Sequence, residues 1–451
     1  MIHATKILSG FSYNLKFEDL SEKVVDTTKK FIADYYAAAF AGIRVNTLFN
    51  EAVNDVILDM GGKQECDFIF SDEKIPAANA AFLSACYAHG ADMDDGNRKA
   101  MGHVGAHVIS CVLTLAQTLP VSGKDVITAI NVGYEVYNRV AAAVQPGLVH
   151  RGFHSTGTAG AIACGAAAAK LMGMDEEGIY NTMALSAIQS SGLIIIAESG
   201  QCCKPVNPAN AAKTGIISAR IIAKGVKSSA FPLESKKGFF HAMSDKVDER
   251  MITDGLGESF TVCESYMKPY PSCRHTHCGI ECALDIRERL PENSVIENVK
   301  VYIYKNAIDI AGQIKVPEVN DDAKFSVHYA LVTALVKGHF NLSDLDVSEF
   351  DSEVLRLIDV TQLIVDEEME KRDLGIRGCR VVVTLEDGSE YEKTVLIPLG
   401  DAEKPFSWQD IKEKLGACCE GLLSSAQQER LLESICSLEN YDSIKTINLY
   451  K

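Results

Sequence analysis

Two patterns of hydrophobic and polar positions divide the chain. Through about the first 260 residues, apolar side chains recur every three or four positions, which is the spacing of helices. Residues 19–42 carry Val24, Phe31, Ile32 and Tyr35 on one such face. Residues 155–174, STGTAGAIACGAAAAKLMGM, carry only Lys170 as a charge. Small residues allow close helix packing, so we expect this segment to be a central buried helix.

After about residue 290 the pattern changes to alternation, which is typical of strands. Residues 294–306 alternate in this way, and residues 379–397 form two β-rich runs around Asp387-Gly388, a strong hairpin signal. Residues 321–338 between them predict a helix that starts after Asp322 and ends near Gly338. The tail, residues 407–419 and 425–438, returns to helical spacing.

These patterns predict a mainly α protein with a smaller α+β domain. We expect residues 1–262 together with 399–451 to form a large all-helical domain. Residues 263–398 then form the α+β domain, and the C-terminal helices pack back on the first domain. No fixed repeat period appears, so a solenoid is not favoured.

Composition narrows the classes of partner. The chain has 451 residues, 47% of them hydrophobic, and a formal net charge of −17, which disfavours nucleic acid and anionic membranes as partners. The 14 cysteines form no C-x-x-C pair, the N-terminal stretch lacks the features of a signal peptide, and no apolar run is long enough to span a membrane. We therefore expect a cytoplasmic protein.

One short segment runs against the acidic balance. Residues 268–277, KPYPSCRHTH, hold Lys268, Arg274, His275 and His277 and no acidic residue. The prolines stiffen an extended approach, and the following residues, THCGIECALDIRERL, predict a helix. The cations therefore gather around the start of a helix.

Two other predicted helix starts carry cations. His154 precedes Ser155 and Thr156, which are natural N-caps, and Lys204 precedes Asn207, a predicted N-cap with Pro208 at the first helical position. Taken alone, such a histidine is more often structural and such a lysine more often solvated. Helix N-termini attract anions, so three cationic starts together indicate a site for a substrate with two or three carboxylates.

A fourth segment, residues 88–107, combines carboxylates and imidazoles. It contains Asp92, Asp94 and Asp95 and the histidines His89, His103 and His107. A divalent metal site is one interpretation, although the spacing fits neither H-E-x-x-H nor an EF-hand. Another is that some aspartates cap helices and His107 is structural. A third places one aspartate and His103 in a pocket for acid–base chemistry. We expect no bound metal.

Taken together, these segments resemble the MmgE/PrpD family, which includes 2-methylcitrate dehydratase, cis-aconitate decarboxylase and iminodisuccinate epimerase. The matching text is DMDDG, GHVGAHVISCVLTLAQ, GFHSTGTAGAIACGAAAAKLMG, KPVNPANAAKTGIISARIIAKG, KPYPSCRHTH and AKFSVHYALVTALVKG. These runs occur in family order between residues 92 and 338. No G-x-G-x-x-G, Walker A or G-x-S-x-G motif points to a nucleotide cofactor or a serine hydrolase.

The resemblance implies cofactor-free chemistry on small polycarboxylates in a homodimer, at a site between a helical domain and an α+β lid. By carry-over, the catalytic positions are Asp92, His103, His154, Lys204 and Lys268. We further expect Ser155, Cys273, Arg274 and His275 to contact the substrate.

The chain also departs from the family pattern. The usual H-P-G reads His103-Val104-Gly105. Cis-aconitate decarboxylases carry His where this chain has Cys273, and Thr where it has Gly96. Both departures disfavour a decarboxylase, and the form YPSCR resembles the epimerase and dehydratase branches instead. We therefore expect a dehydratase acting on a substrate like 2-methylcitrate, with an epimerase as the next alternative and a decarboxylase after it. A metallohydrolase and a non-catalytic helical scaffold remain as alternatives of other classes.

Overall fold

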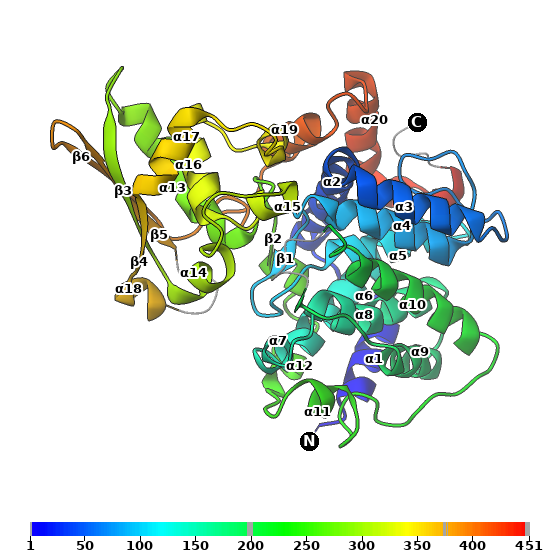
Figure 1. Cartoon of the computed structure of the whole chain (residues 1–451). Helices are drawn as coiled ribbons and strands as arrows, with labels where there is room; N and C mark the ends of the chain where they lie inside the picture. The colour runs from blue at the N-terminus through cyan, green and yellow to red at the C-terminus, as the bar shows by residue number, and fades with distance from the viewer. Residues whose placement is uncertain (1, 196–201, 373–375, 377, 447–451) are drawn as a thin grey trace.

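The computed structural model describes residues 2–195, 202–372, 376 and 378–446, which form two bodies side by side (Figure 1). The larger body is helical and the smaller one combines helices with a sheet, so the predicted fold class is confirmed. Each body has its own hydrophobic core. Domain borders at residues 263 and 398 stay a proposal.

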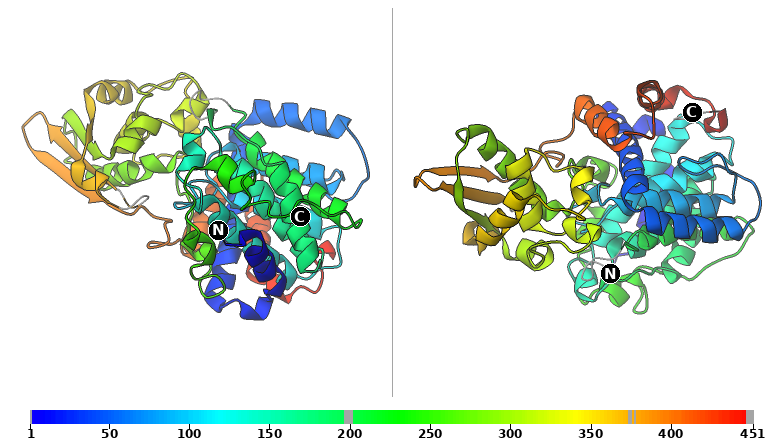
Figure 2. Two further views of the ribbon diagram at one scale, coloured as in Figure 1. Left: turned by 90° about the horizontal axis from the view of Figure 1, so that it is seen from below. Right: turned by 45° about the horizontal axis from the view of Figure 1, so that its top comes forward.

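The helical domain contains the first part of the chain and its C-terminal end, and both labelled termini lie on it (Figures 1 and 2). Its helices are α1 (Ala4–Asn14), α2 (Glu22–Val45), α3 (Thr47–Asp59), α4 (Ala77–Gly90), α5 (Gly105–Ala116), α6 (Gly123–Ala142), α7 (Gly147–His150), α8 (Ser155–Leu171), α9 (Glu176–Ile188), α10 (Val206–Ile222), α11 (Phe239–Met243), α12 (Arg250–Thr253), α19 (Trp408–Cys418) and α20 (Ser425–Cys436).

Helix α8 is the buried central helix that the Gly/Ala-rich sequence predicted. Nearly all of its side chains are buried, and it packs against α5, α6, α9 and α10. A methyl group added at Gly215 of α10 would collide with Cys164 of α8. The small residues therefore set how closely the two helices approach.

The lid domain is built on a four-stranded sheet with the order β4-β3-β5-β6. Its elements are β3 (Ile296–Ile303), β4 (Thr361–Val365), β5 (Cys379–Leu385), β6 (Glu390–Val395), α13 (Arg274–Arg289), α14 (Lys305–Ala311), α15 (Asn320–Ala323), α16 (Val327–Lys337), α17 (Ser352–Val360) and α18 (Glu367–Glu370). Strand β3 pairs in parallel with β4 and antiparallel with β5. The predicted hairpin is confirmed as β5–β6.

The predicted helix over residues 321–338 is split into α15 and α16. Ser326 caps α16 by accepting a hydrogen bond from the backbone N–H of Tyr329, and this extended cap residue breaks the helix. Gly338 ends α16 at φ +79, a left-handed conformation that glycine adopts without strain. The predicted C-terminal end is therefore confirmed, and the predicted start is several residues early.

The C-terminal helices return to the helical domain, as predicted. Lys414 of α19 forms a buried ion pair with Asp34 of α2 at 2.6 Å, and Arg44 of α2 donates to the carbonyl oxygen of Ala417 at 2.6 Å. Figure 1 shows α19 near the junction of the two bodies and α20 beyond it on the helical side. The chain therefore crosses between the domains twice.

A short two-stranded sheet joins the first crossing to the aspartate-rich loop. Strand β1 (Gly96–Asn97) pairs antiparallel with β2 (Ser265–Tyr266), which directly precedes the cationic segment. This pairing brings residues 92–97 and 265–268 together although they are far apart in sequence.

No helix in the described parts of the chain combines the length and apolarity needed to cross a bilayer.

Two predicted helix starts are wrong in detail. Helix α8 has His154 at its N-cap, because the Ser155 hydroxyl donates to the carbonyl oxygen of Met101 and Thr156 lies inside the helix. Helix α10 begins at Val206, and the Asn207 side chain bonds to other partners instead of capping it. The third predicted start, in the segment 268–277, is confirmed at Arg274.

Candidate active site

A pocket of about 590 Å³ lies between the two domains. Residues from both domains line it, including the five carried-over positions Asp92, His103, His154, Lys204 and Lys268. Three of the four expected contact residues also line it, namely Cys273, Arg274 and His275. The fold therefore gathers eight of the nine predicted residues around one space.

Asp92 lies at the centre of the charge arrangement. It follows α4 in a left-handed conformation, φ +54, which aspartate tolerates better than most residues. Its carboxylate accepts hydrogen bonds from Lys204 Nζ at 2.5 Å and Lys268 Nζ at 3.1 Å, and Lys268 also donates to its carbonyl oxygen at 2.7 Å. Burial raises the pKa of Asp92, but the two ammonium groups outweigh burial and hold the pKa well below its ordinary value.

The hydrogen bonds of His103 define its tautomer. Its Nδ1 lies 2.9 Å from the carbonyl oxygen of Asp95 and 3.3 Å from Asp94 Oδ2, and both of these atoms only accept. Nδ1 therefore carries a proton, and in the neutral form of the ring Nε2 holds the lone pair. Nε2 lies 3.8 Å from Asp92 Oδ1. His103 therefore presents a basic nitrogen on the side of Asp92, which itself lines the pocket.

His154 has the opposite tautomer. The Asn207 Nδ2 group donates to the Leu193 carbonyl oxygen at 3.1 Å, which identifies it as the amide nitrogen. The same group lies 3.0 Å from His154 Nδ1, so Nδ1 accepts and Nε2 carries the proton. Burial, and next the charge of Lys204, hold the pKa of His154 well below its ordinary value. His154 is therefore a neutral hydrogen-bond donor near neutral pH.

The other two aspartates of the loop, Asp94 and Asp95, do not line the pocket. Asp95 is buried, and it accepts hydrogen bonds from the Tyr134 hydroxyl at 2.6 Å and from the backbone N–H of Gly105 at 2.6 Å, at the start of α5. Burial raises the pKa of Asp95 to about 7. The prediction that some aspartates cap helices is confirmed for Asp95, which accepts from the backbone N–H groups of Val104 and Gly105.

Of the three histidines of the loop, His107 is structural, whereas His89 and His103 contact Asp94. His107 is fully buried, and burial lowers its pKa to about 3, as expected for a structural residue. The ligand atoms of His89, Asp94 and His103 all lie within 4.8 Å of one another. His89 Nδ1 donates to Asp94 at 2.8 Å, and His103 also faces Asp94. Both imidazoles face the single oxygen Asp94 Oδ2, whereas Asp94 Oδ1 and His89 Nε2 have no hydrogen-bond partner among the described residues, and the absence of a bound metal stays a prediction.

The lid contributes Lys268 and the start of α13. Arg274 forms a close ion pair with Asp401, and its guanidinium lies 5.2 Å from the ring centre of Tyr266. His275 Nδ1 lies within hydrogen-bonding distance of the Tyr304 hydroxyl. Cys273 donates its backbone N–H to the carbonyl oxygen of Lys324 at 2.8 Å, and burial raises the pKa of its thiol. The Cys273 thiol is therefore neutral.

Two residues of the predicted segments do not reach the pocket. Ser155 is fully buried, donates to the Met101 carbonyl oxygen at 2.9 Å and receives the Tyr137 hydroxyl at 3.2 Å. The expected contact of Ser155 with a substrate therefore has no support from its position. His277 is also buried, with its ring against Tyr270.

Sequence reasoning missed several residues that line the pocket. Arg98 forms an ion pair with Glu403 at 2.5 Å, and Phe325 places its ring 5.6 Å from Lys204 Nζ. Phe325 lies within a run that matched the family and Arg98 lies between two such runs, so their position near predicted residues was a usable signal. Tyr304 and its neighbours on α14 come from the lid, and nothing local in their sequence predicts that they face the helical domain.

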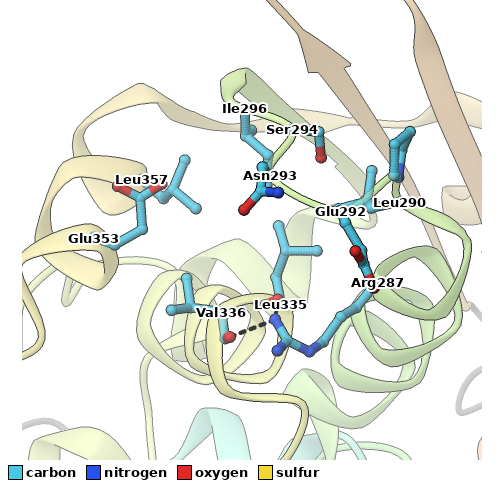
Figure 3. Close-up of a pocket in the computed structure, with 11 residues that line it drawn as sticks. Arg287, Leu290, Glu292, Asn293, Ser294, Ile296, Leu335, Val336, Glu353 and Leu357 are labelled. Atoms are coloured by element: carbon cyan, nitrogen blue, oxygen red, sulfur yellow. Dashed lines mark hydrogen bonds between the residues drawn. The ribbon is translucent and has the colours of Figure 1, made fainter.

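A smaller pocket of about 350 Å³ lies within the lid (Figure 3). Arg287 lines it and donates to the carbonyl oxygens of Leu335, at 2.8 Å, and Val336. Glu292, Asn293 and Glu353 also line it. It contains none of the predicted residues, and its arginine is occupied by backbone carbonyls, so the interdomain pocket is the candidate site.

Comparison with known proteins identifies the class to which this fold and site belong. The model of the MmgE/PrpD N-terminal domain matches residues 6–251, and that of the MmgE/PrpD C-terminal domain matches residues 270–440. The chain therefore belongs to the MmgE/PrpD family, which confirms the resemblance.

Its curated relatives are distant but extend along the whole chain. Cis-aconitate decarboxylase of Aspergillus terreus (strain NIH 2624 / FGSC A1156) is 24% identical over 98% of this chain and 94% of its own. Cis-aconitate decarboxylase of Homo sapiens is 25% identical over 96% and 92%. Cis-aconitate decarboxylase-like protein oryM of Aspergillus oryzae (strain ATCC 42149 / RIB 40) is 23% identical over 97% and 95%.

Proposed function

We propose that this protein is a cofactor-independent lyase that removes a proton from the carbon beside a carboxylate of a small di- or tricarboxylic acid. The proposal rests mainly on the position of His103 Nε2, which lies beside Asp92. Asp92 in turn pairs with Lys204 and Lys268. A base and fixed positive charge are the two elements that such a step needs. Family membership and the named activities of the relatives support the same class.

The chemistry follows from the two tautomers. His103 Nε2 takes the proton from carbon, and the electron pair passes into the neighbouring carboxylate, which becomes a dianion. Lys204 and Lys268 stabilise that added charge, since fixed positive groups in a buried site act strongly on charge that develops during reaction. His154 donates its Nε2–H to a substrate oxygen and orients the acid. In dehydration the electron pair then returns to form the carbon–carbon double bond, and the hydroxyl on the adjacent carbon takes the proton held by His103 and leaves as water.

We place dehydration of a substrate like 2-methylcitrate first among the reactions of this class. Gly96 supports this order, because a side chain there would collide with the hydroxyl of Tyr266, which lines the pocket. The threonine expected of a decarboxylase therefore does not fit beside Tyr266. The neutral thiol of Cys273, in place of a histidine, supports the same order.

Decarboxylation is the second candidate, because the three relatives described above are named as cis-aconitate decarboxylases or decarboxylase-like. Epimerisation of a substrate like iminodisuccinate is the third, since an epimerase needs the same first step. The scaffold alternative expects cations scattered over the surface. It is disfavoured because Lys268 is only 1% exposed and lies against Asp92.

Heavy water distinguishes the three reactions. The protein is incubated in deuterium oxide with citrate-, aconitate-, malate- and succinate-type acids, and proton NMR follows each compound. We expect deuterium on one carbon of one acid, because a carbanion beside a carboxylate takes its proton from solvent in at least one direction. A new vinyl signal identifies dehydration, loss of a carboxyl carbon identifies decarboxylation, and exchange without net change identifies epimerisation. Turnover of a verified substrate without deuterium on carbon contradicts the proposed step.

Cys273→Ser is expected to retain most of the activity. Burial keeps the Cys273 thiol neutral, so we assign it a space-filling role on the pocket wall. The kcat/KM on the substrate found in the heavy-water experiment should stay within about threefold of the wild-type value, a change of less than 1 kcal/mol. Complete loss of activity in a folded Cys273→Ser protein would show that the thiol moves a proton.

A further inference from the structure

The buried carboxylate of Asp94 differs from its three neighbours in how its charge is balanced. Asp34 has Lys414, Asp92 has two lysines, and Asp95 has two backbone N–H groups and a tyrosine. Among the described residues, Asp94 has only imidazole partners, and its Oδ1 has no hydrogen-bond partner. It is 1% exposed. A buried carboxylate is costly unless a partner carries positive charge, and the charge of His103 is the largest influence that holds the pKa of Asp94 well below its ordinary value against burial.

The imidazoles of His89 and His103 both contact Asp94, but they have different roles. His89 Nδ1 donates to Asp94 Oδ2 at 2.8 Å, and burial lowers the pKa of His89 to about 4 even though Asp94 acts against this. His89 therefore stays neutral and anchors the carboxylate. His103 Nδ1 faces the same Oδ2 at 3.3 Å, while its Nε2 lies beside Asp92, which lines the pocket. A proton that reaches His103 from the substrate completes the missing charge balance.

We propose that Asp94, anchored by His89, is the positioning residue of this site: it aims His103 and supplies the counter-charge for the imidazolium that forms when His103 takes the substrate proton. The two ring planes of His89 and His103 meet nearly edge to face, at 79° and 4.7 Å between centres, which fixes both rings around the carboxylate. The Asp95 carbonyl oxygen already fixes the tautomer of His103. Asp94 therefore contributes its negative charge and the orientation of the His103 ring. The inference rests on His103 being the base of the proposed reaction.

The test compares Asp94→Asn with the wild-type protein. Of the charged and titratable groups around His103, only Asp94 changes; the others are Asp92, Asp95, His89, His107 and His154, with Lys204 and Lys268 on Asp92. Selective ¹⁵N labelling of histidine, with His103 assigned through a His103→Gln variant, gives the titration of its ring without any substrate. We expect the midpoint to move to lower pH by about one unit, because a contacting carboxylate favours the charged imidazole. With substrate, kcat should fall about 100-fold at nearly unchanged KM.

Asp34→Asn is the matched control. It removes a carboxylate of equal burial that is paired with Lys414 and does not touch His103. We expect a lower melting temperature and an unchanged His103 titration and kcat. An Asp94→Asn protein that is folded, with the His103 midpoint and kcat of the wild type, overturns the proposal.

His89→Gln keeps the proposal testable if Asp94→Asn does not fold. This change leaves the charge of Asp94 in place but removes its anchor. We expect the His103 signal to broaden or double and kcat to fall about tenfold at unchanged KM. A sharp, wild-type His103 signal with wild-type kcat overturns the anchoring role. Because the NMR signals need no substrate, failure of this inference and failure of the proposed function are seen separately.

Discussion

In a His103→Ala, His154→Ala double variant, transfer of deuterium from solvent to substrate carbon is expected to fall below detection. A positioned acid or base contributes about 10²- to 10⁴-fold to such a step, and this variant removes the base and the donor together. The pKa values of His89 and His107 are low and Asp92 is held by two lysines, so none of these replaces His103. Proton NMR in deuterium oxide measures the exchange.

The single variants separate the two roles. His103→Ala should lower kcat strongly, because it removes the nitrogen that takes the proton. His154→Ala should raise KM more than it lowers kcat, because a neutral donor orients the substrate in the ground state as well. A His3→Ala, His339→Ala double variant, which changes two exposed histidines, is the control and should exchange at the wild-type rate. Exchange that persists in the His103, His154 double variant contradicts the assignment.

Lys268→Ala is expected to lower kcat/KM about 30- to 1,000-fold. This corresponds to about 2–4 kcal/mol of transition-state stabilisation, the usual effect of removing a group that faces developing charge. Lys204→Ala should give a loss of the same order. The fold should persist, since Asp92 keeps one lysine partner in each variant. Steady-state kinetics on the identified acid give kcat/KM, and circular dichroism checks the fold.

Lys29→Ala is the matched control for both lysine variants. Lys29 is also buried, with 7% exposure, donates to the Cys436 carbonyl oxygen at 2.7 Å and pairs with Glu439 at 2.5 Å. Its removal should lower the melting temperature and leave kcat/KM unchanged. If Lys268→Ala is folded and retains the wild-type kcat/KM, Lys268 does not act on the substrate.

The sequence by itself determined the elements whose signal is local. Alternation over residues 294–306 and the Asp387-Gly388 turn predicted β3 and the β5–β6 hairpin, because side-chain periodicity and turn chemistry depend on near neighbours. The Gly/Ala-rich run predicted the buried α8 for the same reason. Pocket residues such as Lys268 came from motifs at helix starts together with the family resemblance.

Only the tertiary structure decided how the charges pair and which nitrogens carry protons. Ser155 was predicted to cap a helix and to contact the substrate, but its hydroxyl donates to the Met101 carbonyl oxygen, 54 residues away in the chain, and it does not line the pocket. Asp92, Asp94 and Asp95 look alike in sequence. They differ because Lys204 and Tyr134 reach Asp92 and Asp95 from distant segments, whereas Asp94 pairs with His89 of its own segment. Burial and partner identity set ionisation, and both arise from contacts that no local pattern encodes.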